Sequence, residues 1–150
     1  MIDTMLADFG NRNGLGDLRL DDNGICRLVV DDVFDVDIEL YGDQVSFFAV
    51  VGPMDSVGPG MLRMMMGANL VGEDTGDATL AVDEISESVV LCRRLPADGL
   101  TYPAFERALE GFLQGFRRWR QELGGHVPAD DMEPHDAASA VDPTMTILRL

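Results

Sequence analysis

The sequence predicts an α+β fold in which helices cover one face of an antiparallel sheet. Strand-like segments come in runs, three between residues 25 and 51 and two between residues 78 and 95. Segments of helical periodicity separate these runs, which is typical of α+β proteins. Short turns, such as residues 41–44, let neighbouring strands pair antiparallel. The predicted order is α-β-β-β-α-β-β-α, in one domain of residues 1–123.

The first helix is predicted at the very start of the chain. Its apolar residues recur at helical spacing: Ile2, Met5, Leu6 and Phe9. We expect Asp3 or Thr4 to cap the start of this helix and Gly10 to end it.

The strands are predicted from apolar and alternating segments. Residues 25–30, 36–40 and 45–51 form the first run, and the middle segment alternates apolar with acidic residues. After a loop at 52–60 and the second helix, residues 78–83 and 88–95 form a second pair. These segments predict an antiparallel meander followed by a hairpin.

The longest helix is predicted at 101–123, where Thr101 can cap the first turn and Pro103 suits it. Its apolar side chains fall within an arc of about 120°. They are Phe105, Leu109, Phe112, Leu113, Phe116, Trp119 and Leu123. Gly111 and Gly115 flank this arc, which favours close packing of another backbone segment against the helix.

The composition changes after this helix. Residues 124–150 contain prolines at three positions and acidic residues at five, and the last six residues are mostly apolar. We expect a largely disordered tail, whose end could dock as a strand or on a partner.

The charge of the chain restricts its partners. The net charge is −16 and the isoelectric point is about 4.1. Nucleic acids and anionic membranes are therefore not expected as partners, because both require a basic surface. Asp3 and Asp8 stand where the cationic start of a signal peptide would be, so we expect a cytoplasmic protein.

Residues suited to catalysis are scarce. His126 and His135 both lie in the predicted tail, and lysine is absent, which excludes Schiff-base and P-loop chemistry. The acidic segment 21–24 resembles part of a calcium loop, but Asp32 stands where its final Glu is required, so a turn is favoured. Cys26 and Cys92 are expected as free thiols. No cofactor, metal or catalytic residue is expected.

The second predicted helix, 59–71, is apolar around most of its circumference. One sheet cannot cover so much apolar surface, so we predict that the same helix of a second copy covers the rest, in a two-fold dimer. The alternative is a helix buried between sheet and loops of one chain. The predicted interface residues are Met61, Leu62, Met64, Met65, Met66, Ala68 and Leu70.

This layout resembles the class I type III secretion chaperones, the CesT (Tir chaperone) family. The resemblance covers residues 1–123 and is carried by the segments LADFG, LRLDDNGICRLVVDD, VDIELYGDQVSFFAVVG, GMLRMMMGANL and ATLAVDEISESVVLCRRLP, followed by the last helix. It implies a dimeric bacterial chaperone that binds the N-terminal segment of a secreted effector in extended form and presents it to the secretion machinery. The secretion ATPase is a further partner that it implies.

An extended client buries apolar side chains in surface grooves and can add a strand to a sheet edge. The expected client-binding residues lie on the first helix and around the first strands; ordinary core packing is the alternative for each. They are Leu6, Phe9, Leu15, Leu18, Leu20, Phe34 and Ile38. Two other functions stay open: a regulatory adaptor of the same fold without an export client, and a small enzyme that uses paired carboxylates or a metal.

Overall fold

The sheet is built around the meander that the sequence predicts. The computed structural model describes residues 1–124 and 146–148, and their strands form one sheet in the order β4-β5-β3-β2-β1-β6. All neighbouring strands pair antiparallel except β1 and β6, which are parallel. The elements are α1 (Ile2–Arg12), β1 (Ile25–Val30), β2 (Phe34–Tyr41), β3 (Gln44–Pro53), α2 (Pro59–Val71), β4 (Thr79–Asp83), β5 (Ser88–Pro96), α3 (Tyr102–Gly124) and β6 (Thr146–Leu148).

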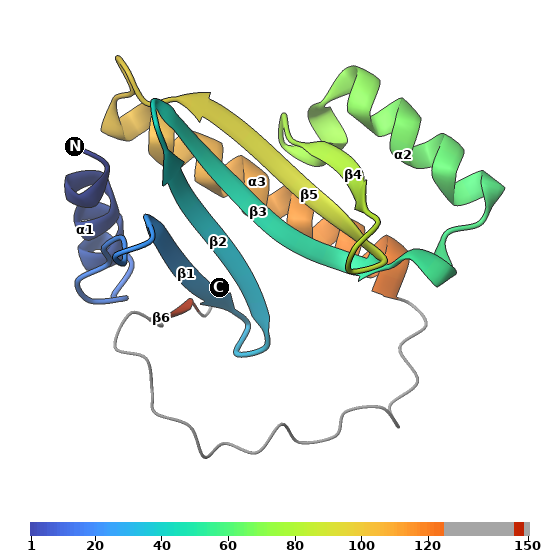
Figure 1. Cartoon of the computed structure of the whole chain (residues 1–150), viewed down its shortest axis with the longest axis horizontal. Helices are drawn as coiled ribbons and strands as arrows, with labels where there is room; N and C mark the ends of the chain where they lie inside the picture. The colour runs from blue at the N-terminus through green and yellow to red at the C-terminus, as the bar shows by residue number, and fades with distance from the viewer. Residues whose placement is uncertain (125–145, 149–150) are drawn as a thin grey trace.

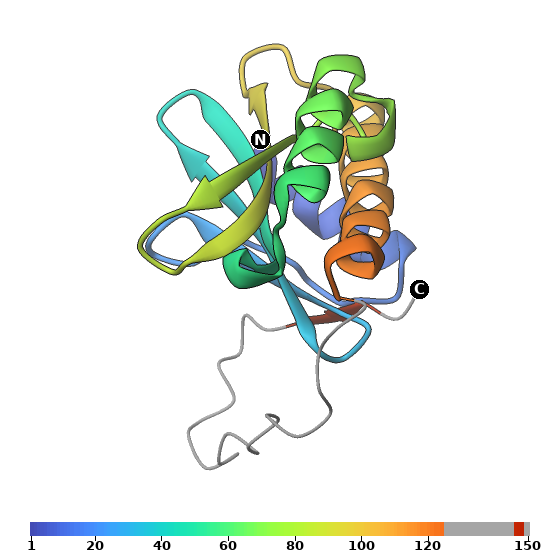
Figure 2. The same ribbon diagram turned by 90° about the vertical axis from the view of Figure 1, so that its right-hand side faces the viewer.

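The helices lie on one side of this sheet (Figure 2). Figure 1 shows α3 running behind the strands, α1 at the β1 end and α2 beyond β4. The predicted order α-β-β-β-α-β-β-α is confirmed for residues 1–124.

Buried and exposed residues alternate along the strands, and the apolar side chains of α3 lie on one side of the helix. The core therefore lies between the sheet and α3. Every residue of the predicted α3 arc is buried. The ring of Phe47 on β3 meets the rings of Phe105 and Phe112 edge to face, with centroids 5.7 Å away in both cases. Such aromatic pairs contribute about 1 kcal/mol each beyond the area they bury, which fixes α3 across the middle of the sheet.

The first helix differs from the expectation at both ends. Its N-cap is Met1 without a side-chain cap, and the Asp3 carboxylate instead accepts a hydrogen bond of 3.0 Å from the backbone N–H of Leu20. The helix continues past Gly10 to Arg12. A Cβ on Gly10 would overlap the carbonyl oxygen of Gly16. The glycine is therefore needed because the loop after the helix packs closely against this position, and it does not end the helix.

The predicted loop at 52–60 is shorter than expected. Gly52 and Pro53 still pair with β5, after a register shift between Val50 and Gly52. A single 3-10 turn, η1 (Met54–Ser56), follows, and α2 begins at Pro59. A Cβ on Gly52 would lie 2.9 Å from the Cβ of Leu123, so this end of β3 packs closely on α3.

A second 3-10 turn, η2 (Glu73–Thr75), sits directly on α3. A Cβ on Gly115 would lie 2.5 Å from the carbonyl oxygen of Thr75, and one on Gly76 would overlap the carbonyl of Gly111. The indole N–H of Trp119 donates a 3.2 Å hydrogen bond to the carbonyl of Asp74. The close backbone packing predicted at Gly111 and Gly115 is confirmed, and η2 is the segment packed there.

The predicted tail falls mostly outside the described residues. Gly124 is the last residue of α3. Thr146–Leu148 lies beside β1 as β6, whereas residues 125–145 and 149–150, which include both histidines, are not described.

Both cysteines in the described part of the chain are free thiols. Cys26 is fully buried, and burial raises its pKa to about 11; Cys92 is partly exposed, and burial also raises its pKa.

Because the thiolate is the reactive form, we expect iodoacetamide at pH 7.5 to label Cys92 slowly and Cys26 at least tenfold more slowly. Mass spectrometry of the native and the urea-unfolded chain measures this difference. Equal labelling of the two thiols in the native chain would contradict the burial of Cys26.

Candidate binding surfaces

The second helix is held to the rest of the chain along one narrow side. Pro59 occupies its first turn, and Gly72 ends it in the left-handed conformation at φ 79°. Met65 and Ala68 are buried in the chain's own core, at 3% and 8% exposure. Met61 and Asn69 are partly buried beside them, and the other residues from Leu62 to Val71 are exposed.

Asn69 fixes this orientation through its side-chain amide. Its Nδ2 donates to the carbonyl of Leu80 at 2.9 Å, and its Oδ1 accepts from the backbone N–H of Leu80 at 2.8 Å. The amide thus makes the two hydrogen bonds that a neighbouring strand would make with β4. Two partly buried bonds of this kind hold α2 to the edge of the sheet.

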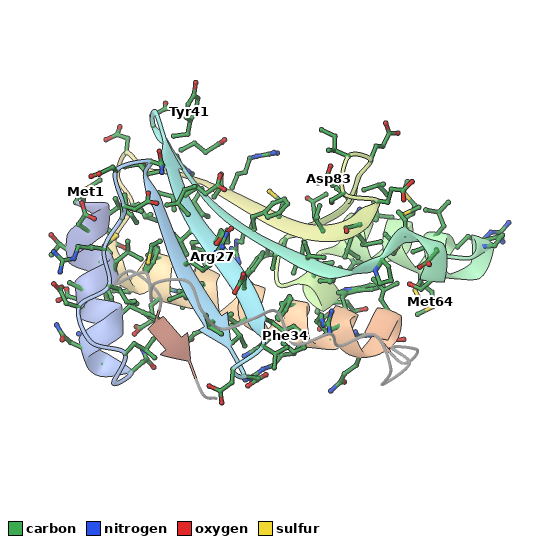
Figure 3. All side chains as sticks on the ribbon, turned by 60° about the horizontal axis from the view of Figure 1, so that its bottom comes forward. Met1, Arg27, Phe34, Tyr41, Met64 and Asp83 are labelled. Carbon is green, nitrogen blue, oxygen red and sulfur yellow. The ribbon has the colours of Figure 1, made fainter. Side chains whose placement is uncertain are left out.

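The opposite side of α2 presents a row of apolar side chains to solvent. Leu62, Met66 and Leu70, which we call the α2 ridge, are 48%, 66% and 87% exposed. They follow at a spacing of four residues, which aligns side chains into a ridge that fits the groove of another helix. Met64 and Val71 are exposed on the other flank, beside a cleft of about 270 Å³ that Trp119 and Arg118 also line. Figure 3 places Met64 at the end of the molecule away from Met1.

The structure divides the predicted interface residues into two groups. Met65 and Ala68 are core residues of the single chain, and Met61 is partly buried against the core. Leu62, Met64, Met66 and Leu70 are exposed and remain available to a partner. Sequence reasoning missed Val71, which is 70% exposed; it is the last residue of the helix, where periodicity gives little signal.

The predicted client-binding residues also divide. Leu6, Phe9, Leu18 and Ile38 are buried in the core and present no surface to a client in this structure. Leu15, Leu20 and Phe34 are partly buried at the rim of the core. Leu15 and Leu20 lie in the loop that packs on α1, where the N–H of Leu15 donates to the carbonyl of Gly10 at 2.8 Å.

Phe34 lies in a pocket between the β1–β2 turn and the end of α3 (Figure 3). Its ring meets Phe116 edge to face at 5.9 Å, and the guanidinium of Arg120 stacks over it at 4.0 Å. The cavity measures about 610 Å³. The residues that line this Phe34 pocket are Asp31, Phe34, Phe116, Arg117, Arg120, Gln121 and Gly124.

The Phe34 pocket combines an apolar floor with hydrogen-bond donors. Arg120 donates to the carbonyl of Val51 at 3.4 Å, while its buried Nε has no hydrogen-bond partner among residues 1–124 and 146–148. Burial lowers the pKa of Arg120 without neutralising it. Arg117 pairs with Asp31 at 3.5 Å. An apolar side chain whose backbone or carboxylate oxygen faces the guanidinium groups fits this chemistry.

From the sequence alone, Arg120 is expected on a solvated face of the last helix or in a pair with a local acid. In the structure it is instead half-buried between Phe34 and the end of β3. Its position four residues after Phe116 is the signal that could have found it, since this spacing puts both side chains on one flank of the helix. Arg118 does pair with an acid, Asp74, at 2.7 Å.

The acidic residues in the described part of the chain serve turns and ion pairs. Within this part, no group of three or more His, Cys, Asp or Glu side chains is arranged to hold a metal ion. Asp21 accepts hydrogen bonds from the N–H groups of Ile25 and Asn23, both at 2.9 Å, and the bond from Ile25 is the main cause of its lowered pKa. The turn favoured over a calcium loop is therefore what forms at residues 21–24.

The outer face of the sheet is acidic along β2. Asp35, Asp37 and Glu39 point away from the helices, and Arg27 on β1 pairs with Asp37 at 2.7 Å.

None of the helices in residues 1–124 combines the length and the apolar character that a membrane-spanning helix needs.

Comparisons with known proteins agree on one family. A family model described as the Tir chaperone protein (CesT) family matches residues 4–120. The chain is 23% identical to the Tir chaperone of Citrobacter freundii, covering 71% of this chain and 69% of that protein. It is 28% identical to ExsC, a transcriptional anti-antiactivator of Pseudomonas aeruginosa, covering 81% of this chain and 85% of that protein.

Solved structures share the fold. A chain of the ExsC–ExsE complex superposes with a TM-score of 0.67 at 28% identity, covering 81% of this chain and 92% of that one. A chain of the HopA1–SchA chaperone–effector complex gives a TM-score of 0.67 at 21% identity, covering 80% and 93%.

Proposed function

Because this chain belongs to the Tir chaperone protein (CesT) family of type III secretion chaperones, we propose that it binds the N-terminal segment of a secreted effector. The client is held extended, kept soluble and competent for secretion, and presented to the secretion apparatus. The observation that carries this proposal is the Phe34 pocket, an apolar site of about 610 Å³ edged by guanidinium groups. The protein acts by binding, not by catalysis.

The Phe34 pocket suits an extended segment because it offers one apolar anchor site together with side-chain hydrogen-bond donors. Phe34 and Phe116 provide apolar surface, and the guanidinium groups of Arg117 and Arg120 at the pocket can donate to a client carbonyl. Leu15 and Leu20 add partly buried apolar surface in the loop between α1 and β1. Anchors separated along the molecule favour an unfolded client, which can reach all of them at once.

The working form that we propose is a homodimer in the bacterial cytoplasm, joined through the α2 ridge of both copies. Ridges at a spacing of four residues pack across two-fold axes at an angle near −50°. Met66 and Leu70 are 66% and 87% exposed in the single chain. Leaving these apolar side chains in water is unfavourable, and burying them in such an interface is favourable. The secretion ATPase is the further partner to which a loaded dimer would deliver its client.

Filling the Phe34 pocket is expected to weaken client binding. Gln121 is exposed at its rim, so Gln121→Trp places an indole over the cavity without altering the core. We expect the affinity for the N-terminal segment of an effector that co-purifies with this chain to fall at least tenfold, as measured by calorimetry. Phe34→Ala, which removes the floor of the pocket, is expected to act in the same direction.

Matched controls lie next to each position. Gln114 is exposed on α3 outside the pocket, and Val33 is 58% exposed beside Phe34. Gln114→Trp and Val33→Ala should therefore leave the affinity unchanged. Full-strength binding by both Gln121→Trp and Phe34→Ala would rule out this pocket as the anchor site.

A regulatory adaptor without an export client is the second candidate. The likeness to a protein described as a transcriptional anti-antiactivator favours it, because that description gives the relative a regulatory role. Co-purification from the native bacterium separates the two functions. A captured protein that is never secreted supports the adaptor, and a captured secreted protein supports the chaperone.

A further inference from the structure

The first strand of the meander is covered on its outer edge by the chain's own C-terminal segment. β6 pairs with β1 in parallel, with Leu28 opposite Thr146, Val29 opposite Ile147 and Val30 opposite Leu148. Figure 1 shows this short strand beside β1 at the end of the sheet away from β4. Without β6, β1 would present a row of unpaired N–H and C=O groups.

The edge of β1 is well built to accept a strand. Leu28 and Val30 are fully buried toward the helices, and Val29 is only 5% exposed on the other face. The strand is therefore fixed on both faces, and its backbone groups are held in position for a partner. Strand addition to such an edge draws its affinity from main-chain hydrogen bonds, so it accepts many sequences.

The sequence of residues 125–148 favours a segment of this chain as the strand that pairs with the edge of β1. Residues 125–145 hold five acidic residues and three prolines, whereas the segment after them reads Thr-Ile-Leu, of which Thr and Ile are good strand formers. These 21 connecting residues reach about 70 Å when extended, which is ample for a return from α3 to β1. Because the segment belongs to the same chain, it reaches the edge intramolecularly, which favours it over a free peptide of the same sequence.

We propose that Thr146–Leu148 is a self-strand that occupies the acceptor edge of β1 until an extended segment of a client replaces it. The role of the client in this exchange rests on the proposed function. The occupancy of the edge does not, because it concerns this chain alone. The self-strand pairs with the backbone groups of the β1 edge when no client is bound. A client segment can then pair with β1 only after it displaces Thr146–Leu148.

Hydrogen–deuterium exchange of the full chain tests the occupancy without any client. Ile147→Pro removes one N–H and disfavours the paired conformation at the centre of β6. We expect the β1 amides that face β6 to exchange at least tenfold faster in this variant, while β3 amides are unchanged. Ala138→Pro, which adds a proline to the connecting residues, is the control and should exchange like the natural chain. Equal β1 exchange in all three proteins would overturn the proposal.

A synthetic peptide of residues 143–150 tests the acceptor edge directly. It should bind the Ile147→Pro chain at least tenfold more tightly than the natural chain, as measured by fluorescence anisotropy, because the tethered strand no longer competes. The same peptide with proline at position 147 is the control and should bind neither. Equal affinity of the unaltered peptide for both chains would overturn the proposal.

The client segment completes the test. If the self-strand covers the edge nine-tenths of the time, the client should bind Ile147→Pro about tenfold more tightly than the natural chain. Client binding that is equal in both would overturn displacement. A client that binds neither chain would overturn the proposed function, while the exchange and peptide measurements would still decide whether the self-strand exists.

Discussion

A chain that carries Met66→Asp and Leu70→Asp is expected to be a folded monomer, whereas the natural chain is expected to be a dimer at micromolar concentration. Both side chains are exposed in the single chain, at 66% and 87%, so the substitutions cost the monomer little. In a two-fold interface they bury four carboxylates against apolar surface and against one another. We expect the dimer dissociation constant to rise at least 100-fold, as measured by light scattering after size-exclusion chromatography.

Two comparisons make this result specific to the α2 ridge. Ile85→Asp changes a residue that is 97% exposed in the β4–β5 turn, and the dimer should persist. Met65→Asp places a charge at a site that is 3% exposed in the core, and this variant should unfold and not dissociate into folded monomers. A natural chain that is monomeric, or a double variant that stays dimeric, would show that the interface lies elsewhere.

The substitution Gly76→Ala is expected to lower the free energy of unfolding by about 3 kcal/mol. Gly76 has φ 62°, and a Cβ there would overlap the carbonyl of Gly111 on α3. Alanine would therefore add left-handed strain and also push η2 off the helix. Urea denaturation followed by circular dichroism measures the loss.

Gly99→Ala separates the two contributions. Gly99 has φ 71°, but nothing lies within 4 Å of a Cβ built on it. This control carries the backbone strain alone and should lose about 1 kcal/mol. If the two variants lost the same stability, the close contact between η2 and α3 would contribute nothing to the free energy of unfolding.

Periodicity predicted the parts of the fold in which one face of an element is buried. The α3 arc and the meander follow directly from spacings of 3.6 and 2 residues, because a sheet and a helix each bury one side. Single residues that act across the fold were beyond this reasoning. In the sequence, Gly10 looks like the end of a helix. Only the structure shows that the carbonyl of Gly16 packs against it, where a side chain would clash.

The binding surfaces were harder to predict than the fold, because the same apolar residues fill cores and grooves. Leu18 and Leu20 lie in one segment with one pattern, yet Leu18 is 2% exposed and Leu20 is at the rim. Only the packing of α1 and its following loop separates them. Arg120 was missed for a related reason: a charged residue suggests solvent, but its guanidinium stacks over the aromatic ring of Phe34.

The paired hydrogen bonds of Asn69 bear on how this protein avoids polymerising. A sheet that accepts a foreign strand at β1 would join copies end to end if its opposite edge, β4, were equally open. At Leu80 the amide of Asn69 already holds both backbone groups that a strand from another copy would need. One side chain on a helix thus closes the β4 edge at Leu80, so a strand that replaces β6 at the β1 edge could not be continued by a strand added at β4 of the same sheet.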